Sequence, residues 1–204
     1  MRCNLCGSND NEIIFEYTRF ERNNILKCKN CGLVFLDVKK TKKEVEQFYG
    51  ENYRKVDTLP EKSAEEMFND PVIRHDCKNR IEWIKKRYGN IKGKRILEIG
   101  SASGYFLDAL SSMDAKEVVG VELTEDYANY AKKLGFATYT KPVEDIGFKN
   151  EFDLVVSFHT LEHVSDPMSV VHAAMLSLNK GGGYLWVKYL IRMTGELKYS
   201  IAPW

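Results

Sequence analysis

The chain has 204 residues, of which 44% are hydrophobic and 29% charged, a composition that excludes a disordered or low-complexity protein. Thirty basic residues stand against 29 acidic ones, so the formal net charge of +1 gives no global field that would attract nucleic acid or an anionic membrane. The longest apolar runs fall far short of the roughly 20 residues that a membrane span requires. Because residues 1–4 lead into no apolar stretch, no secretory signal is expected and the expected location is cytoplasmic.

Two copies of a Cys-x-x-Cys-Gly pattern lie near the start of the chain. One copy contains Cys3 and Cys6, and the other contains Cys28 and Cys31. Two such turns point four sulfurs at one centre, and the glycine after each pair tolerates a positive φ. Reducing conditions disfavour disulfides. We therefore expect a structural four-thiolate metal site, for which Zn²⁺ is favoured and iron is the alternative.

This site predicts a zinc-ribbon-like domain over residues 1–39. Short strands are expected at Glu12–Tyr17 and Leu33–Leu36, where apolar and β-branched residues cluster. Basic residues exceed acidic ones by two over residues 1–40, and a zinc tetrathiolate cancels that excess. The charge balance therefore disfavours nucleic acid as a partner.

Residues 40–92 have helical apolar spacing among many charges and predict a helical linker or lid. A break is expected from Thr58 to Ser63. Cys77 lies at helical spacing from neighbouring isoleucines, which indicates packing and not chemistry. Three side chains of this segment are candidate acceptor contacts: Tyr49, Tyr53 and Arg74.

Residues 93–190 predict an α/β domain. A buried strand at Arg95–Ile99 leads into a small-residue loop at Gly100–Gly104 and a helix at Tyr105–Ser112. Alternating strands and helices predict a mostly parallel sheet with helices on both faces. The further strands are expected at Glu117–Val121, Phe136–Tyr139, Phe152–Ser157 and Tyr184–Val187, and the further helices at Thr124–Leu134 and Pro167–Leu178.

The loop after the first strand narrows the ligand class. A dinucleotide fingerprint needs glycine where this chain has Ala102 and Tyr105, which disfavours a nicotinamide cofactor. Glu122 ends the second strand, a place from which a carboxylate accepts hydrogen bonds from ribose hydroxyls. A ribose-bearing ligand is therefore expected.

Three segments resemble a known family. Ile96–Gly104, with the sequence ILEIGSASG, resembles the first motif of class I S-adenosylmethionine-dependent methyltransferases. Val119–Glu122 resembles the second motif, and Phe152–Pro167 resembles the region after the fourth strand. The resemblance implies a Rossmann-like α/β fold over about half of the chain. The cysteine-rich front end resembles a subset of these enzymes found in sugar and cell-surface polysaccharide pathways.

The resemblance also implies roles for residues of this chain. Gly100 and Gly104 would line the methionine moiety of S-adenosylmethionine, and Glu98 would orient the loop or the ligand's amino group. Glu122 would hold the ribose, and residues 143–145 would flank the adenine. The full set of expected cofactor-binding residues is Glu98, Gly100, Ser101, Gly104, Glu122, Leu123, Val143, Glu144 and Phe158.

Two histidines are candidates for a general base. His159 and His163 are four residues apart, so a helical turn would place both imidazoles on one side. Histidine titrates near neutrality and suits an oxygen or carbon acceptor, whereas the alternative is that this stretch only packs the loop. The sequence at Ser157–Thr160 lacks the Asn/Asp-Pro-Pro-Tyr pattern of enzymes that methylate amide and nucleobase nitrogens. The expected acceptor is small and sugar-like, and the expected reaction is O- or C-methylation.

Only 17 residues follow Val187, whereas the family usually adds two more strands. We therefore expect five strands without the closing hairpin, and a short tail over residues 191–204. A bare fifth strand needs a cover, because an open sheet edge promotes aggregation. The tail could fold over it, or a second copy could pair with it as a homo-oligomer. The third alternative is a truncated, non-catalytic cofactor-binding or zinc-scaffold remnant.

Overall fold

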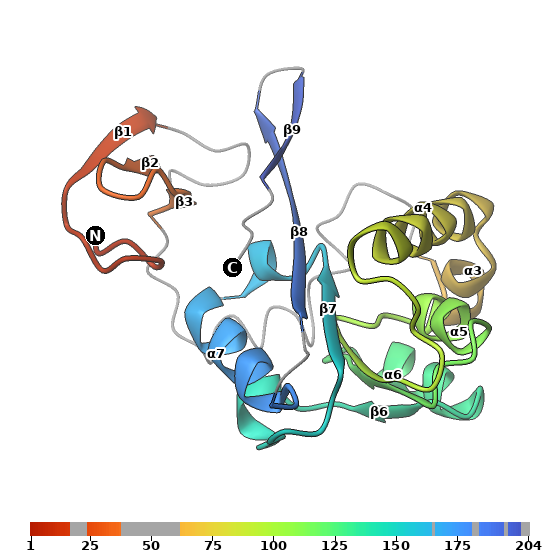
Figure 1. Cartoon of the computed structure of the whole chain (residues 1–204). Helices are drawn as coiled ribbons and strands as arrows, with labels where there is room; N and C mark the ends of the chain where they lie inside the picture. Colours follow the sequence, from red (N-terminus) through yellow and green to blue (C-terminus); the bar gives the residue numbers. More distant parts are fainter. Residues whose placement is uncertain (17–23, 38–61, 165, 181–183, 194–195, 201–204) are drawn as a thin grey trace.

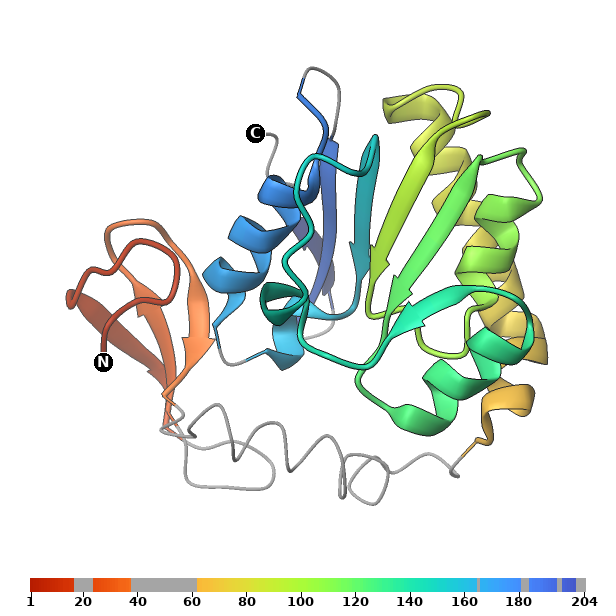
Figure 2. The same cartoon turned by 90° about the horizontal axis from the view of Figure 1, so that it is seen from below.

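The computed structural model of the chain describes residues 1–16, 24–37, 62–164, 166–180, 184–193 and 196–200 (Figure 1). A small antiparallel sheet at the N-terminal end precedes a larger α/β part. Helices cover both faces of the larger sheet (Figure 2). Within these ranges, every helix is too short or too polar to cross a lipid bilayer.

The N-terminal sheet has three antiparallel strands in the order β1-β2-β3. They are β1 (Asn11–Phe15), β2 (Ile25–Cys28) and β3 (Val34–Leu36). The two predicted strands are present to within two residues, as β1 and β3. The central strand β2 was not predicted; of its four residues, only Cys28 had been assigned, as part of the second metal-binding turn.

The described part of the predicted helical segment contains two capped helices. Helix α3 (Ala64–Asn69) begins with a capping box, in which Glu66 N donates to Ser63 Oγ and Ser63 N donates to a Glu66 carboxylate oxygen. Helix α4 (Pro71–Arg87) is capped by Asp70, whose carboxylate accepts hydrogen bonds from two backbone N–H groups. Tyr49, Tyr53 and most of the predicted break at residues 58–63 lie outside the described residues.

Helix α4 packs one face on the larger sheet. Cys77, Ile81 and Ile84 belong to the same buried cluster as Ile96 and Phe106. Burial raises the pKa of the Cys77 thiol to about 11. The prediction that Cys77 serves packing is confirmed.

The larger sheet has six strands in the order β6-β5-β4-β7-β8-β9. The first five in this order are parallel neighbours, and β9 is antiparallel to β8. The strands are β4 (Arg95–Ile99), β5 (Glu117–Val121), β6 (Ala137–Tyr139), β7 (Leu154–Phe158), β8 (Tyr184–Met193) and β9 (Glu196–Ser200). The helices between them are α5 (Tyr105–Ser111), α6 (Glu125–Lys133) and α7 (Pro167–Ser177), with 3-10 helices η2 (Val143–Asp145) and η3 (Leu161–His163). The predicted α/β class is confirmed.

Strand β4 is buried on both faces. Ile96 belongs to the core cluster that contains α4 and α5 side chains, whereas Leu97 belongs to the cluster that contains α7 side chains. Side chains alternate along a strand, so consecutive apolar residues fill both layers. This is why the central strands are mostly apolar in the sequence and do not alternate with polar residues.

The prediction of five strands without a closing hairpin is wrong. Strand β8 continues past Val187 to Met193. Its residues Tyr189–Met193 pair antiparallel with β9 (Glu196–Ser200). The sequence-based boundary ended β8 too early, which left too few residues for another strand. Because β9 pairs with β8, the proposed reason for a homo-oligomer through a bare β8 edge no longer applies.

One carboxyl group is buried in the middle of the sheet. Glu98 on β4 is 1% exposed, and within the described residues its Oε2 has no hydrogen-bond partner. Burial raises the pKa of Glu98 to about 8, opposed by the positive charge of Arg80 and assisted by the negative charge of Glu122. Arg80 is itself buried and forms an ion pair with Asp76 at 2.7 Å. Glu98 is therefore mostly protonated at neutral pH in this structure.

This raised pKa predicts a pH dependence of stability. The folded chain binds the Glu98 proton more tightly than the unfolded chain, whose glutamate pKa is about 4.3. Between these pKa values the free energy of unfolding falls as pH rises. Glu98→Gln keeps the shape and cannot ionise, so the melting temperature of the variant minus that of wild type should increase from about pH 5 to about pH 8. Thermal unfolding of both proteins in matched buffers measures this difference, which cancels titration elsewhere in the chain. A difference that stays constant with pH would show that Glu98 titrates normally.

Candidate active site

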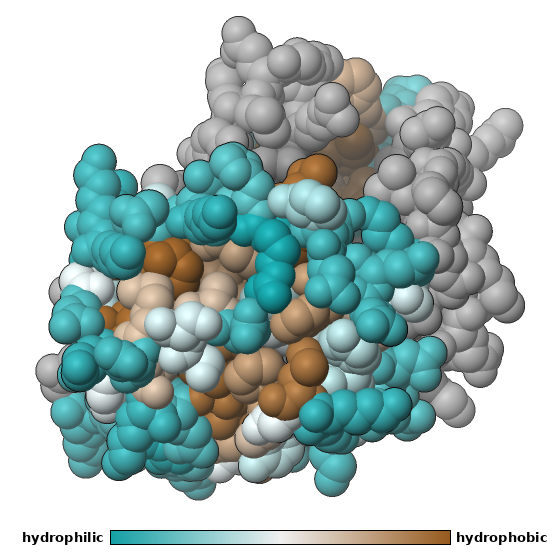
Figure 3. Space-filling model, turned by 90° about the vertical axis from the view of Figure 1, so that its right-hand side faces the viewer, coloured by the Kyte–Doolittle hydropathy of each residue, from teal (hydrophilic) through white to brown (hydrophobic). Residues whose placement is uncertain are grey.

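A cavity of about 280 Å³ lies at the edge where the carboxyl ends of β4, β5 and β7 meet. Figure 3 shows the surface on the side of the molecule that carries α3 and α4, where hydrophilic residues surround a smaller group of apolar residues. The lining residues of the cavity are Met67, Ile99, Gly100, Ala102, Tyr105, Val121, Glu122, Leu123, Thr124, Tyr127, Pro142, Val143, Glu144, Phe158, His159, Thr160, His163, Val164 and Val170.

Most of the predicted site residues lie around this one cavity. The predicted residues that line it are Gly100, Glu122, Leu123, Val143, Glu144, Phe158, His159 and His163. Glu98, Ser101 and Gly104 do not line it. Glu98 lies within β4 and Ser101 in the loop that follows it, and each is 1% exposed, whereas Gly104 ends that loop as the N-cap of α5.

Gly104 and Ser101 have packing contacts that explain their positions. Gly104 precedes α5, and a Cβ there would lie 3.0 Å from the Cβ of Ala131 on α6. Ser101 Oγ occupies the space beside Gly120 on β5, where a Cβ would approach it to 2.5 Å. These contacts hold the loop tightly against its neighbours, so both residues support the cavity wall from outside.

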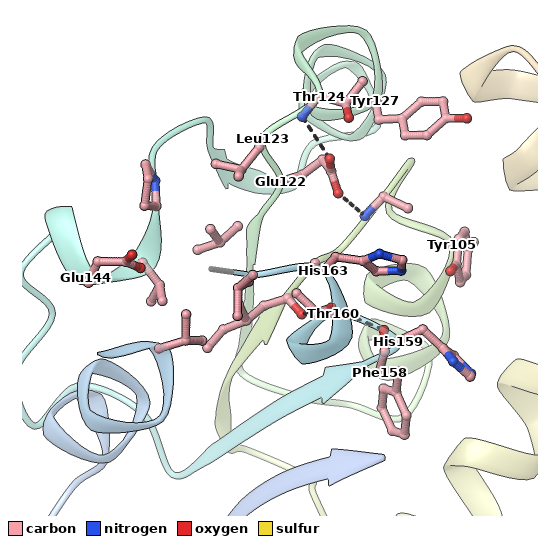
Figure 4. Close-up of a pocket in the computed structure, with 18 of the residues that line it drawn as sticks. Tyr105, Glu122, Leu123, Thr124, Tyr127, Glu144, Phe158, His159, Thr160 and His163 are labelled. Atoms are coloured by element: carbon pink, nitrogen blue, oxygen red, sulfur yellow. Dashed lines mark hydrogen bonds between the residues drawn. The ribbon is translucent and has the colours of Figure 1, made fainter. Parts of the chain in front are cut away.

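The Glu122 carboxylate joins two loops of the cavity. One oxygen accepts a hydrogen bond from Ala102 N at 2.9 Å, and the other accepts one from Thr124 N at 2.8 Å (Figure 4). Each carboxylate oxygen has a second lone pair. Glu122 therefore fixes the loop after β4 and still has acceptor capacity for a ligand hydroxyl.

The labelled side chains follow one another along the cavity. Glu144 lies at one end, Tyr105 and the histidines lie at the other, and Glu122 lies between them (Figure 4). Leu123 and Val143 line the cavity through the loop after β5 and through η2. The cavity thus has an apolar end with one acid, a central carboxylate and an end with titratable rings.

The predicted helical turn through both histidines is wrong. His159 has φ of 54°, in the left-handed region, and η3 begins only at Leu161. His163 is the last residue of η3, and its backbone N–H donates to Thr160 O at 2.9 Å. Both histidines still line the same cavity, because the chain turns at His159 and returns through η3.

Several lining residues were not predicted as part of the site. Tyr105 begins α5, and burial raises the pKa of its phenol to about 12. Tyr127 lies one helical turn after Thr124, and its hydroxyl donates to Lys62 O at 3.2 Å. Helical spacing from the loop after β5 was the sequence signal that could have identified Tyr127. Met67 had no such signal, because it reaches the cavity from a helix distant in sequence.

Arg74 does not line the cavity. Its guanidinium forms an ion pair with Asp108 on α5 at 2.7 Å and lies 4.4 Å from the ring centroid of Phe68. Arg74 therefore connects α3, α4 and α5. The sequence-based suggestion of an acceptor contact is not supported.

The four N-terminal cysteines lie together. Their sulfurs are all within 4.8 Å of one another, with Cys3 to Cys31 at 3.5 Å and Cys6 to Cys28 at 3.6 Å. A tetrahedral Zn²⁺ with Zn–S bonds of about 2.3 Å separates its sulfurs by about 3.8 Å. The glycine after each pair has a positive φ, and its N–H donates to the carbonyl of the first cysteine of that pair. The donor set and its spacing fit one tetrahedral metal ion.

Comparison with known proteins identifies relatives of the larger part. Residues 73–199 match a family described as a methyltransferase domain. Ubiquinone biosynthesis O-methyltransferase from Bordetella avium is 32% identical over 130 residues, which cover 60% of this chain and 53% of that protein. The protein of the same name from Hydrogenovibrio crunogenus is 34% identical over 131 residues, covering 60% and 52%. The chain thus spans about half the length of the curated relatives it matches.

Solved structures share the fold at low sequence identity. The PH0226 protein from Pyrococcus horikoshii superposes with a TM-score of 0.53 and 18% identity, covering 59% of this chain and 60% of that one. A SAM-dependent methyltransferase from Aquifex aeolicus superposes with a TM-score of 0.51 and 19% identity, covering 65% and 76%. Since the family match covers more than half of this chain, the chain belongs to the S-adenosylmethionine-dependent methyltransferases, as its three motifs predicted.

Proposed function

We propose that this chain binds S-adenosylmethionine in the described cavity and transfers its methyl group to a hydroxyl oxygen of a small organic acceptor. The observation that carries the proposal is the order of Glu144, Glu122 and the two histidines along one cavity. This order matches adenine, ribose and sulfonium in the extended cofactor. The cofactor is proposed to lie with its adenine at Leu123 and Val143.

The chain's own residues have separable roles in this proposal. Leu123 and Val143 supply apolar contacts to the adenine, and Glu144 accepts a hydrogen bond from its amino group. Glu122 already accepts one hydrogen bond at each carboxylate oxygen from a backbone N–H group. The second lone pair of each oxygen accepts a hydrogen bond from a ribose hydroxyl. When bound, S-adenosylmethionine supplies an electrophilic methyl carbon on a positively charged sulfur. His159 or His163 takes the proton of the acceptor hydroxyl at an imidazole nitrogen as that oxygen attacks.

The acceptor class follows from the relatives' names and from the lining. Both named relatives are O-methyltransferases of ubiquinone biosynthesis, which supports an oxygen acceptor. These names give no support to the sugar-like acceptor or the C-methylation expected from the sequence. Met67, Tyr105 and Tyr127 line the cavity and favour an acceptor with apolar surface next to its hydroxyl.

The test has two stages. Calorimetric titration of the purified chain with S-adenosylmethionine asks whether the cavity binds it. Transfer of a radiolabelled methyl group is then measured with acceptors that carry phenolic, alkyl or sugar hydroxyls. Methylation of a phenolic or alkyl hydroxyl supports the proposal, whereas methylation of sugars alone would overturn the acceptor class. Cofactor binding without transfer to any acceptor would favour the non-catalytic alternative.

Replacement of Glu122 tests the ribose assignment. Glu122→Ala should weaken S-adenosylmethionine binding by about 2–3 kcal/mol, the scale of charge-assisted hydrogen bonds. The matched control is Glu125→Ala, which removes an exposed acid at the start of α6, outside the cavity lining. Calorimetric dissociation constants measure both effects. Equal affinity of the Glu122 variant and wild type would remove Glu122 from the binding site.

Replacement of the histidines tests the proton transfer. Asn at the position of the base should lower kcat by about 100-fold to 10,000-fold, because a positioned base contributes this much. Cofactor affinity should change little in that variant, because the base acts on the acceptor and not on the cofactor. Steady-state kinetics of His159→Asn and His163→Asn measure these effects. Near wild-type rates in both variants would assign the two residues to packing of the loop.

We also propose that the four cysteines bind one structural Zn²⁺. A closed shell of four thiolates leaves no open position for catalysis, so the metal holds the three-stranded sheet together. Elemental analysis should find one zinc per wild-type chain and none in Cys28→Ser. Cys77→Ser is the matched control and should keep its zinc, since Cys77 lies outside the cluster. Iron in the wild-type protein would contradict the choice of zinc but support a metal site at these cysteines. Equal metal content in Cys28→Ser and Cys77→Ser would contradict the metal site itself.

A further inference from the structure

Thr160 links the ends of two strands at the floor of the cavity. It follows His159, and its side chain turns back toward β4 (Figure 4). Its Oγ1 lies 3.1 Å from Ile99 O, at the end of β4, and 3.2 Å from Phe158 O, at the end of β7. The hydroxyl can donate to either carbonyl. One side chain therefore lies within hydrogen-bond distance of both strand ends, which the ladder between β4 and β7 also joins.

The space that this hydroxyl occupies exists because residue 100 is glycine. A Cβ at Gly100 would lie 2.1 Å from Thr160 Oγ1 and 3.1 Å from both Cβ and Cγ2 of Thr160. Any other residue at position 100 would displace the threonine side chain. Gly100 and Thr160 are therefore a matched pair across the cavity floor.

This pair lies where the cavity is least tolerant of movement. Gly100, Phe158, His159 and Thr160 all line the cavity, and His159 has a left-handed φ that a non-glycine residue rarely adopts. A conformation of this kind persists only when surrounding contacts hold it. The Thr160 hydroxyl binds the carbonyl of the residue immediately before His159. It thus supports the turn that directs His159 to the cavity.

From these contacts we propose that Thr160 is a positioning residue, whose hydroxyl sets the geometry of the Gly100 loop and of His159 at the sulfonium end of the cofactor. This inference rests on the proposed function. It assigns to Gly100 a second requirement besides backbone conformation, which is to leave room for the threonine hydroxyl.

Two substitutions separate the hydroxyl from the shape of the side chain. Thr160→Val keeps the branched shape and removes the hydroxyl, whereas Thr160→Ser keeps the hydroxyl. We expect Thr160→Val to raise the dissociation constant for S-adenosylmethionine about fivefold to tenfold and Thr160→Ser to stay within about twofold of wild type. Where turnover is measurable, kcat should fall in Thr160→Val and recover in Thr160→Ser.

Ser157→Ala is the matched control. Ser157 Oγ donates to the same Ile99 carbonyl at 3.1 Å, yet Ser157 is buried and does not line the cavity. Its loss should change affinity less than Thr160→Val does, even if both variants lose similar thermal stability. Equal affinity losses in the two variants would reduce Thr160 to a structural residue and overturn the proposal. Wild-type affinity in Thr160→Val would do the same.

A second measurement uses the matched pair and does not depend on ligand. Gly100→Ala should lower the midpoint of denaturant unfolding, and adding Thr160→Ala should recover part of that loss, because the 2.1 Å contact is removed. Additive losses would contradict the pairing. The calorimetric titration of the wild-type chain tests the proposed function separately. If the wild-type chain does not bind S-adenosylmethionine, the proposed function is rejected, whatever the unfolding data show for the pair.

Discussion

The parallel pairing of β4 with both β5 and β7 is the constraint on which the cavity depends. Parallel strands end at the same edge of a sheet, so the loops after these three strands must meet there. Glu122 and Phe158 both line one cavity although α6, β6, η2 and most of β7 lie between them in the chain. The side chains on both faces of β4 pack into buried clusters, so this strand is held in the interior of the sheet between β5 and β7.

The polar groups of the cavity also hold its walls. Glu122 binds two backbone amides, and Ile99 O accepts from both Ser157 and Thr160. The same atoms that would face a ligand are thus already fixed by the fold. A site built in this way needs little rearrangement on binding, so less of the binding free energy is lost in ordering the loops.

The sequence predicted the parts of the fold that depend on local pattern. The bounds of β4 and β5 agree with the prediction, because both are short apolar runs limited by polar or small residues. The cap of α7 was also predicted, since Asp166 precedes a proline and its carboxylate accepts two N–H groups. Where tertiary pairing decides the outcome, prediction failed. Strand β9 pairs with the edge of β8, and the alternation of polar and apolar residues over Glu196–Ser200 was a strand signal that the prediction did not use.

In the candidate site too, residues fixed by local spacing were predicted and residues placed by tertiary contacts were not. The acidic and glycine residues of the motifs reached the cavity or its supporting layer, because spacing within one strand–loop–helix unit fixes their places. The turn at His159 was missed, since a left-handed φ at a non-glycine residue is held by tertiary contacts, which local spacing does not reveal. Met67 was missed because it lies more than 30 residues before Gly100 in the sequence, and the spacing of residues within one motif does not predict contacts across such a separation.

The N-terminal sheet raises a different question of stability. Within its described residues the buried apolar side chains are few, namely Cys3, Leu26 and Cys28, whereas Ile13, Phe15 and Leu36 are exposed. Burial of so little apolar surface cannot offset the conformational entropy of a sheet of this size. Two of the three buried residues are themselves metal-ligand candidates, so the interior of this sheet is largely the cysteine cluster. The proposed zinc would therefore supply the stabilisation that a hydrophobic core supplies in the larger part of the chain.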